Sequence, residues 1–128
     1  MKKGVVAVLL GILMISTPVH AQELMRGHAT VYSLEGKTAM GTRTRIGVCA
    51  TGNRELLGKL VAVYQRKPDD SLGELIGIYS VEDTGCKSNV IDIWCPKEHQ
   101  KTIINKTWEN GCKGKIYIQT IEVKGEKE

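Results

Sequence analysis

The sequence has little excess charge of either sign, and this limits the partners that it can attract. Its 18 lysines and arginines stand against 14 aspartates and glutamates, which gives a net charge of +4. Proteins that bind nucleic acid through phosphate contacts need a concentrated positive surface. We therefore expect no nucleic-acid partner. The basic residues between Lys37 and Lys67 are interpreted as solvated strand and loop edges, with attraction of an anionic polymer as the alternative.

Long apolar runs are absent except near the N-terminus, where residues 5–15 form one between Lys2-Lys3 and Val19-His20-Ala21. A positive start, a short apolar run and small residues at its end are typical of a signal peptide. The run is too short for a lasting membrane span, and the residue directly after Ala21 is not a cysteine that could accept lipid. We predict a signal peptide over residues 1–21, no membrane attachment after its cleavage, and a soluble, secreted or periplasmic protein.

The remaining residues, 22–128, are enough for one small domain and not for two. They contain no internal repeat, low-complexity tract or linker. A domain of this size buries a limited core, and exported domains commonly add disulfides to compensate. We expect a single, disulfide-stabilised, monomeric domain.

A C-x-x-C pair is also missing, although the sequence has four cysteines. Such pairs are typical of structural zinc sites, so we expect no metal and no cofactor. An even number of cysteines in an exported domain predicts disulfides among Cys49, Cys86, Cys95 and Cys112. Three connectivities are possible. If residues 97–110 form a straight helix of about 20 Å, Cys95 and Cys112 are an awkward pair, which leaves Cys86 with either of them.

Short strand-like segments dominate the domain. Residues 28–32 and 59–65 have alternating side chains, and residues 75–81 are apolar and β-branched, which predicts three strands. Turn residues separate them at 35–37, 51–53 and 67–71. Residues 114–123 predict a last strand in which the apolar phase shifts after Ile118, as a bulge or burial on both faces would produce.

One helix is predicted, over residues 97–110. Pro96 suits a first-turn position, Ile104 and Trp108 are four residues apart, and Asn110-Gly111 is a stop signal. Several strands, one late helix and a final strand fit a small closed β-barrel, because closure removes the edges that short strands otherwise expose. The predicted fold class is therefore mainly β.

Two carboxylates form the clearest candidate site: Asp83 in Val-Glu-Asp-Thr-Gly-Cys and Asp92 in Ile-Asp-Ile-Trp-Cys. Asp83 precedes Thr84-Gly85, which is turn chemistry. Asp92 is set among apolar residues, where a charge is costly without a partner or a task. If residues 90–94 form a strand, Asp92 shares a face with Trp94. Burial there, with Asp83 or Glu82 as a like charge nearby, would raise the pKa of Asp92, as a general acid requires.

These residues, in this order, resemble a known family. The run Ile78-Tyr79-Ser80-Val81-Glu82-Asp83-Thr84-Gly85, then Val90-Ile91-Asp92-Ile93-Trp94, then a helix and a strand ending in Ile-Glu-Val, resembles the 3D (three-aspartate) domain. His28-Ala29-Thr30-Val31-Tyr32 and residues 57–64 resemble its upstream strands. The resemblance implies a six-stranded double-psi β-barrel. That fold is similar to the barrel of membrane-bound lytic transglycosylase A, to rare lipoprotein A and, more distantly, to expansin and barwin domains.

The resemblance also implies roles for the two carboxylates. Asp92 matches the catalytic acid and base of the transglycosylases, and Asp83 matches its companion in the Asp-Thr-Gly turn. The sequence departs from the family pattern at residues 49–51, where a third aspartate is missing, and at the short connection 86–89. We also expect no counterpart of the second domain that completes the substrate groove of lytic transglycosylase A.

One carboxyl group suffices for this chemistry, because it protonates the leaving oxygen and then draws a sugar hydroxyl into ring closure. A two-carboxylate hydrolase instead needs a fixed separation, about 5 Å for retention or 6.5–9.5 Å for inversion. Trp94, Tyr32 and Thr84 are the candidates for sugar binding. The alternatives are turn and structural acceptor roles for Asp83 and Asp92, and core packing for both aromatic residues.

Two functions remain open. The first is an exported peptidoglycan-active protein that cleaves glycan strands in the manner of a lytic transglycosylase, with Asp92 as general acid and base. The alternative is an expansin-like or barwin-like module that binds cell-wall polysaccharide without cleaving it. The Asp83 and Asp92 pair favours the first, and the short connection and single domain favour the second. Peptidoglycan glycan strands are the expected partner of the first function. A protein inhibitor or toxin-like partner is a third alternative without a positive signal.

Overall fold

The structure is a computed structural model and describes residues 23–122. Within this range the strands are β2 (Met25–Tyr32), β3 (Val48–Ala50), β4 (Leu60–Arg66), β5 (Leu72–Asp83), β6 (Val90–Trp94) and β7 (Lys115–Ile121). The helical elements are η2 (Arg54–Leu56), η3 (Lys97–His99), α2 (Gln100–Trp108) and η4 (Glu109–Gly111). The signal peptide predicted over residues 1–21, and the end of the predicted last strand at Val123, lie outside the described residues.

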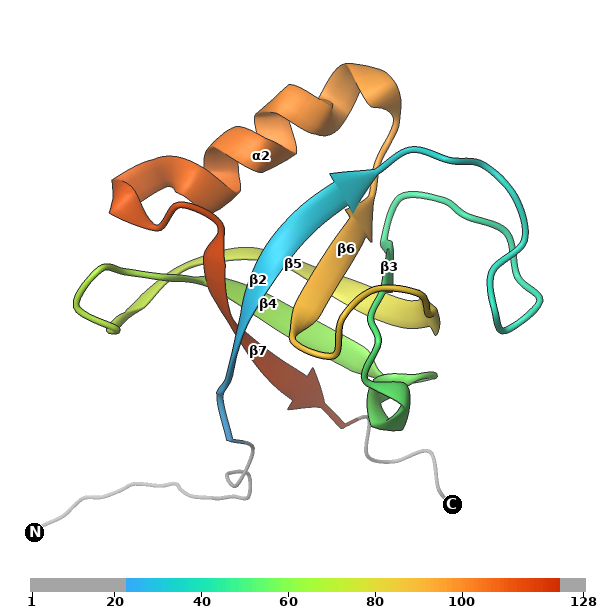
Figure 1. The fold of residues 1–128 in the computed structure, drawn as a ribbon, viewed down its shortest axis with the longest axis horizontal. Helices are drawn as coiled ribbons and strands as arrows, with labels where there is room; N and C mark the ends of the chain where they lie inside the picture. Colours follow the sequence, from blue (N-terminus) through green and yellow to red (C-terminus); the bar gives the residue numbers. More distant parts are fainter. Residues whose placement is uncertain (1–22, 123–128) are drawn as a thin grey trace, which may run out of the picture.

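The six strands close into one barrel in the order β2-β6-β3-β5-β4-β7 (Figure 1). Two neighbouring pairs are parallel, β2 with β6 and β3 with β5, and the other four are antiparallel. Closure pairs each described strand on both sides, which removes the exposed edges of so small a sheet. The prediction of a mainly β, six-stranded closed barrel is confirmed, and this mixed arrangement is compatible with a double-psi barrel.

Alternating side chains fill the barrel. Ile91 and Ile93 of β6 are buried in the core, so the side chains between and after them, Asp92 and Trp94, belong to the outer face of the strand. In β7 three consecutive residues, 116–118, are buried. Both faces of β7 are therefore buried at residues 116–118, whereas residues 119–121 are partly exposed.

Strand β3 has no counterpart among the strands predicted from alternation. The predicted segments 28–32, 75–81 and 90–94 lie in strands, and the segment predicted over 59–65 lies in β4 from Leu60 onward. It contains only Val48, Cys49 and Ala50, and all three are buried. A fully buried strand of three residues shows no alternation of polar and apolar side chains, so periodicity cannot detect it.

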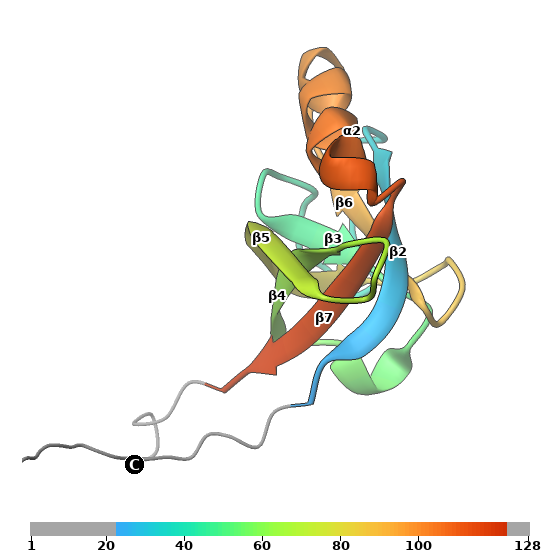
Figure 2. The ribbon, with the colours of Figure 1, turned by 90° about the vertical axis from the view of Figure 1, so that its left-hand side faces the viewer.

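The predicted helix is confirmed as one helical segment in which η3, α2 and η4 follow one another. Figure 2 shows α2 over one end of the barrel, with β2 and β7 side by side below it. Asn110 has a φ of 59° inside η4, at the predicted stop. Ile103 packs against the core, while Ile104 and Trp108 are exposed. No helix within residues 23–122 has the length and apolarity needed to cross a membrane.

The prediction of disulfides is wrong for this structure, because all four cysteines are free. Cys49 is buried in the core, and Cys86 lies between β5 and β6 with its Sγ 3.7 Å from the carbonyl oxygen of Ala50. Cys95 and Cys112 stand at the two ends of the helical segment. The number of cysteines carries no information about where a fold places them, and bridged Cα atoms must approach to about 4.4–6.8 Å.

Gln65 of β4 fixes the end of the helical segment to the barrel. Its side chain is fully buried. Its Nε2 donates to the carbonyl oxygen of Lys106 at 2.7 Å, and its Oε1 accepts from Nδ2 of Asn110 at 3.0 Å. The same oxygen accepts from the backbone N–H of Glu74 on β5 at 3.4 Å. One buried amide therefore joins the helical segment to two strands.

Replacing this amide tests its contribution. Gln65→Ala leaves buried donors and acceptors without partners, and we expect it to lower the free energy of unfolding by about 2–3 kcal/mol. Gln119→Ala, at a partly exposed position of β7, is the matched control and should change it by less than about 0.5 kcal/mol. Urea unfolding followed by circular dichroism measures both. Equal effects of the two substitutions would contradict this role of Gln65.

Candidate functional site

The barrel places the two predicted carboxylates, Asp83 and Asp92, opposite the same residue of the strand that lies between them. Ala50 of β3 pairs with Asp83 of β5 on one side and with Asp92 of β6 on the other. Asp92 pairs in turn with Thr30 of β2. Adjacent strands lie about 4.7–4.9 Å apart, so Asp83 and Asp92 are separated by the width of one intervening strand. The place where the family pattern suggests a third aspartate, residues 49–51, is occupied by this intervening strand.

A β-bulge decides which way Asp83 points. Cys49 pairs with Val81 and the next residue, Ala50, pairs with Asp83, so β5 has one extra residue at Glu82. Without the bulge, alternation would give Asp83 the same inward orientation as the buried Val81. A bulge re-aims the side chains around it. Glu82 and Asp83 consequently both contact the loop of residues 33–47, which we call the β2–β3 loop.

Asp92 lies half-buried on the outer side of β6. The hydroxyl of Thr30 donates to its Oδ1 at 2.7 Å. Burial raises the pKa of Asp92 above its ordinary value, the Thr30 hydrogen bond opposes this shift, and the negative charge of Asp83 adds to it. The direction is the one that a general acid requires. It is also the shift expected for an aspartate among apolar residues with a like charge nearby.

Asp83 is held by backbone amides, as a turn acceptor is. Its Oδ1 accepts from the backbone N–H of Ala39 at 2.9 Å and from that of Thr84 at 3.0 Å. Its Oδ2 lies 3.5 Å from the hydroxyl of Tyr32. Thr84, predicted as a sugar-binding residue, contacts Asp83 through its backbone N–H.

Tyr32, the last residue of β2, is close enough to both carboxylates to feel their charges, and its hydroxyl lies beside Asp83. Burial raises the pKa of Tyr32, and the charges of Asp83 and Asp92 raise it further. The phenol is therefore a neutral hydrogen-bond donor at neutral pH. Tyr32, Asp83 and Asp92 are three predicted site residues that the fold does bring together.

Glu82 is not the like charge that raises the pKa of Asp92, because only Asp83 has this effect; the ionised Glu82 is paired with Arg45. Both guanidinium nitrogens of Arg45 bind its carboxylate, at 2.9 and 2.8 Å, and the hydroxyl of Thr42 donates to it as well. The Arg45 hydrogen bond is the main cause that lowers the pKa of Glu82 to about 2. Glu82 is 6% exposed, so this pair fixes the β2–β3 loop against the barrel. Nothing in the sequence pattern pairs these two residues, which are 37 positions apart.

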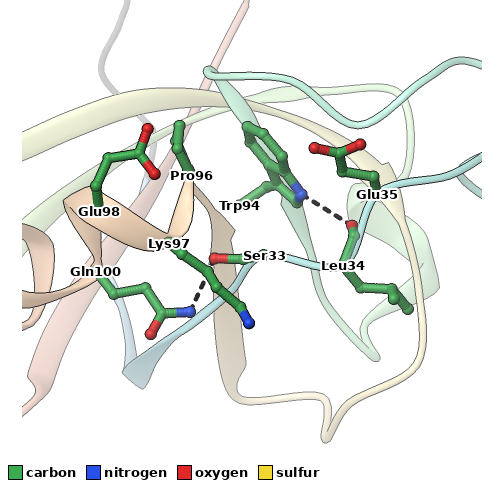
Figure 3. A pocket seen from close by; sticks show the side chains of 8 residues that line it. All are labelled: Ser33, Leu34, Glu35, Trp94, Pro96, Lys97, Glu98 and Gln100. Carbon is green, nitrogen blue, oxygen red and sulfur yellow. Dashed lines mark hydrogen bonds between the residues drawn. The ribbon is translucent and has the colours of Figure 1, made fainter.

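Trp94 serves the packing of the barrel and also lines a pocket. It is 8% exposed, and its Nε1 donates to the carbonyl oxygen of Leu34 at 2.9 Å. Beside it lies a pocket of about 590 Å³, walled by residues that follow β2 and by residues that follow β6 (Figure 3). The sequence predicted Trp94 and missed the pocket, because its walls come from two segments about 60 residues apart.

Within residues 23–122, no group of three or more histidine, cysteine, aspartate or glutamate side chains is arranged to hold a metal ion. Compared with models of known protein families and with curated proteins, the chain has no match.

The ion pair between Glu82 and Arg45 gives the protein a pH-dependent stability. The pKa of Glu82 is about 2 when folded against an ordinary value of 4.5, so its contribution is complete above pH 4.5 and is lost as the pH falls towards 2. We expect Glu82→Gln to lower the free energy of unfolding by about 1–3 kcal/mol at pH 7 and by less at pH 2.

Urea unfolding at pH 7, 4 and 2 measures this dependence. Glu74→Gln, at an exposed position of the same strand, is the control. Its difference from wild type in the free energy of unfolding should not change between pH 7 and pH 2. A difference between wild type and Glu82→Gln that stays constant from pH 7 to pH 2 would contradict the assignment.

Proposed function

We propose that this protein is an exported peptidoglycan-active enzyme that cleaves glycan strands as a lytic transglycosylase does. The observation that carries the proposal is the half-buried Asp92, whose pKa is raised by burial and by the neighbouring charge of Asp83. A carboxyl group in this environment retains its proton to higher pH than an ordinary aspartate. It can therefore donate that proton to a leaving oxygen and recover one in the same cycle.

The reaction requires two proton transfers at Asp92. The protonated carboxyl donates to the glycosidic oxygen as the bond from that oxygen to C1 breaks, and the sugar ring is left with oxocarbenium character. The Asp92 carboxylate then takes the proton of the C6 hydroxyl of the same sugar, whose oxygen bonds to C1 and closes an anhydro ring. No water is consumed, and Asp92 returns to its protonated form.

The neighbouring side chains support this cycle. The Thr30 hydroxyl donates to Oδ1 of Asp92 and so limits the directions in which the carboxyl group can turn. Asp83, fixed by two backbone amides, supplies a negative charge that stabilises a developing oxocarbenium ion. The neutral hydroxyl of Tyr32 donates to Asp83 at 3.5 Å in the free protein and can donate to a sugar oxygen in its place when substrate binds.

The proposal extends to the family and the compartment. The closed mixed barrel, with the Asp83 turn and Asp92 across one strand from each other, supports a double-psi barrel of the 3D type. Secretion or export to the periplasm follows from the predicted signal peptide, and peptidoglycan glycan strands are the proposed partner.

A second candidate is a wall-binding module of expansin or barwin type that does not cleave. One observation favours it: the Oδ1 atom of Asp83 is already occupied by the amides of Ala39 and Thr84, as in a structural turn. In this case the outer face of β2 and β6 holds a glycan strand without chemistry.

Product analysis separates the two candidates. Purified sacculi incubated with the protein should release muropeptides with anhydro ends, detected by mass spectrometry. Asp92→Asn, which keeps the size of the side chain, should reduce this release by at least about 100-fold, in line with the loss of a general acid and base. Asp69→Asn, on the exposed β4–β5 turn, is the matched control and should release as much as wild type.

Three outcomes are distinguishable. Anhydro ends that depend on Asp92 support the enzyme. Binding to sacculi without soluble products, equal in wild type and Asp92→Asn, supports the binding module and overturns the enzyme. Products with reducing ends would show hydrolysis by water, which contradicts ring closure at C1.

A further inference from the structure

We propose that the pocket beside Trp94 binds an amine-bearing peptide stem of the glycan, so that the protein prefers strands that carry peptides to bare strands. This inference rests on the proposed function, because it names the substrate form that the same site takes. It does not follow from Asp92, whose chemistry needs only the sugar.

The position of the pocket relative to Asp92 is fixed by the parallel pairing of β2 and β6. Thr30 pairs with Asp92 and Tyr32 pairs with Trp94, so both strands run from the carboxyl site towards the pocket. Two residues of a strand span about 6.6–6.8 Å. Ser33, Leu34 and Glu35 continue from β2 into one wall of the pocket, and Pro96, Lys97 and Glu98 continue from β6 into the other. A glycan held at Asp92 therefore has its adjacent substituent within reach of the pocket.

The pocket combines an apolar floor with unpaired charges. Figure 3 shows Glu35 and Glu98 on opposite sides of Trp94 and Pro96, with Lys97 extending past Ser33. Neither glutamate is paired within the described part of the chain, and Lys97 forms no ion pair there either. These side chains are exposed.

Other polar groups of the pocket are already engaged. The Trp94 Nε1–H is bonded to the Leu34 carbonyl oxygen at 2.9 Å, and the Gln100 side chain donates to the Ser33 hydroxyl at 2.8 Å. These bonds fix the walls of the pocket. Glu35, Glu98 and Lys97 are the charged groups that are available to bind a ligand.

This set of groups fits a zwitterionic aliphatic guest. Ionised carboxylates only accept hydrogen bonds, so Glu35 or Glu98, one on each side of the pocket, can accept from an ammonium group, which offers three donors. The surfaces of Trp94 and Pro96 suit a short aliphatic chain that carries that ammonium group. Lys97 suits a carboxylate of the same guest. A neutral N-acetyl sugar offers neither charge, whereas a peptide stem with a diamino acid offers both.

Binding to chemically modified sacculi tests the inference. We expect wild type to bind sacculi with free amines about three- to tenfold more tightly than sacculi whose amines have been acetylated, because exposed ion pairs contribute modestly. The double variant Glu35→Gln/Glu98→Gln should bind both preparations equally. Glu55→Gln/Glu74→Gln removes the same charge from exposed positions outside the pocket and should keep the preference.

A soluble probe separates this inference from the proposed function. A synthetic stem peptide that contains a diamino acid, with its side-chain amine free or acetylated, needs no cleavage to be recognised. Only the free-amine peptide should shift the Trp94 indole resonance in a nitrogen–proton spectrum, and the Glu35→Gln/Glu98→Gln variant should lose that shift.

Equal binding of free and acetylated peptides, or an unchanged preference in the Glu35→Gln/Glu98→Gln variant, overturns the inference even if Asp92-dependent anhydro products are found. Amine-dependent shifts without any anhydro product support the pocket while the enzyme proposal fails.

Discussion

The β-bulge at Glu82 is the constraint on which the geometry of the site depends. By adding one residue to β5 opposite β3, it changes the side to which Asp83 is directed. Both partners of Ala50, Asp83 and Asp92, then belong to the same outer surface of the barrel. A regular ladder would direct the Asp83 carboxylate towards the core, where an unpaired charge costs several kcal/mol. The short β3 strand, with its small Ala50, separates the two carboxylates by one strand.

The same bulge anchors the β2–β3 loop at two consecutive residues. Glu82 binds Arg45 and Thr42, and Asp83 accepts from the amide of Ala39. These contacts order the part of the loop beside Asp83. The first residues of the same loop, 33–35, and the residues that follow β6 build the pocket. The strand order of the closed barrel accounts for three features of the site. These are the burial that raises the pKa of Asp92, the neutral hydroxyl of Tyr32 and the charged pocket.

Much of the fold follows from sequence pattern, and the exceptions have physical causes. Segments with alternation, such as residues 28–32 and 90–94, lie in strands, and the Asn110-Gly111 stop marks the end of the helical segment. Strand β3 was not predicted because three buried residues contain no alternation. The disulfides were wrongly predicted because a count of cysteines contains no distances.

The candidate site was predictable where neighbouring residues define the environment. Asp92 among apolar side chains already indicates a raised pKa, and Asp83 before Thr84-Gly85 indicates a turn. The ion pair of Glu82 with Arg45 and the pocket of Glu35 and Glu98 depend on segments distant in the chain. Only the closed barrel brings these segments together, so no local pattern reveals them.

The proposed chemistry at Asp92 depends most on the electrostatic coupling of the two carboxylates across β3. Titration of the Asp92 side-chain carboxyl carbon by NMR, in wild type and in Asp83→Asn, measures this coupling without any assumption about substrate. Removing the negative charge of Asp83 should lower the pKa of Asp92, while Asp69→Asn on the exposed β4–β5 turn should leave it unchanged. An Asp92 pKa that is the same in Asp83→Asn and in wild type would contradict the coupled site described above.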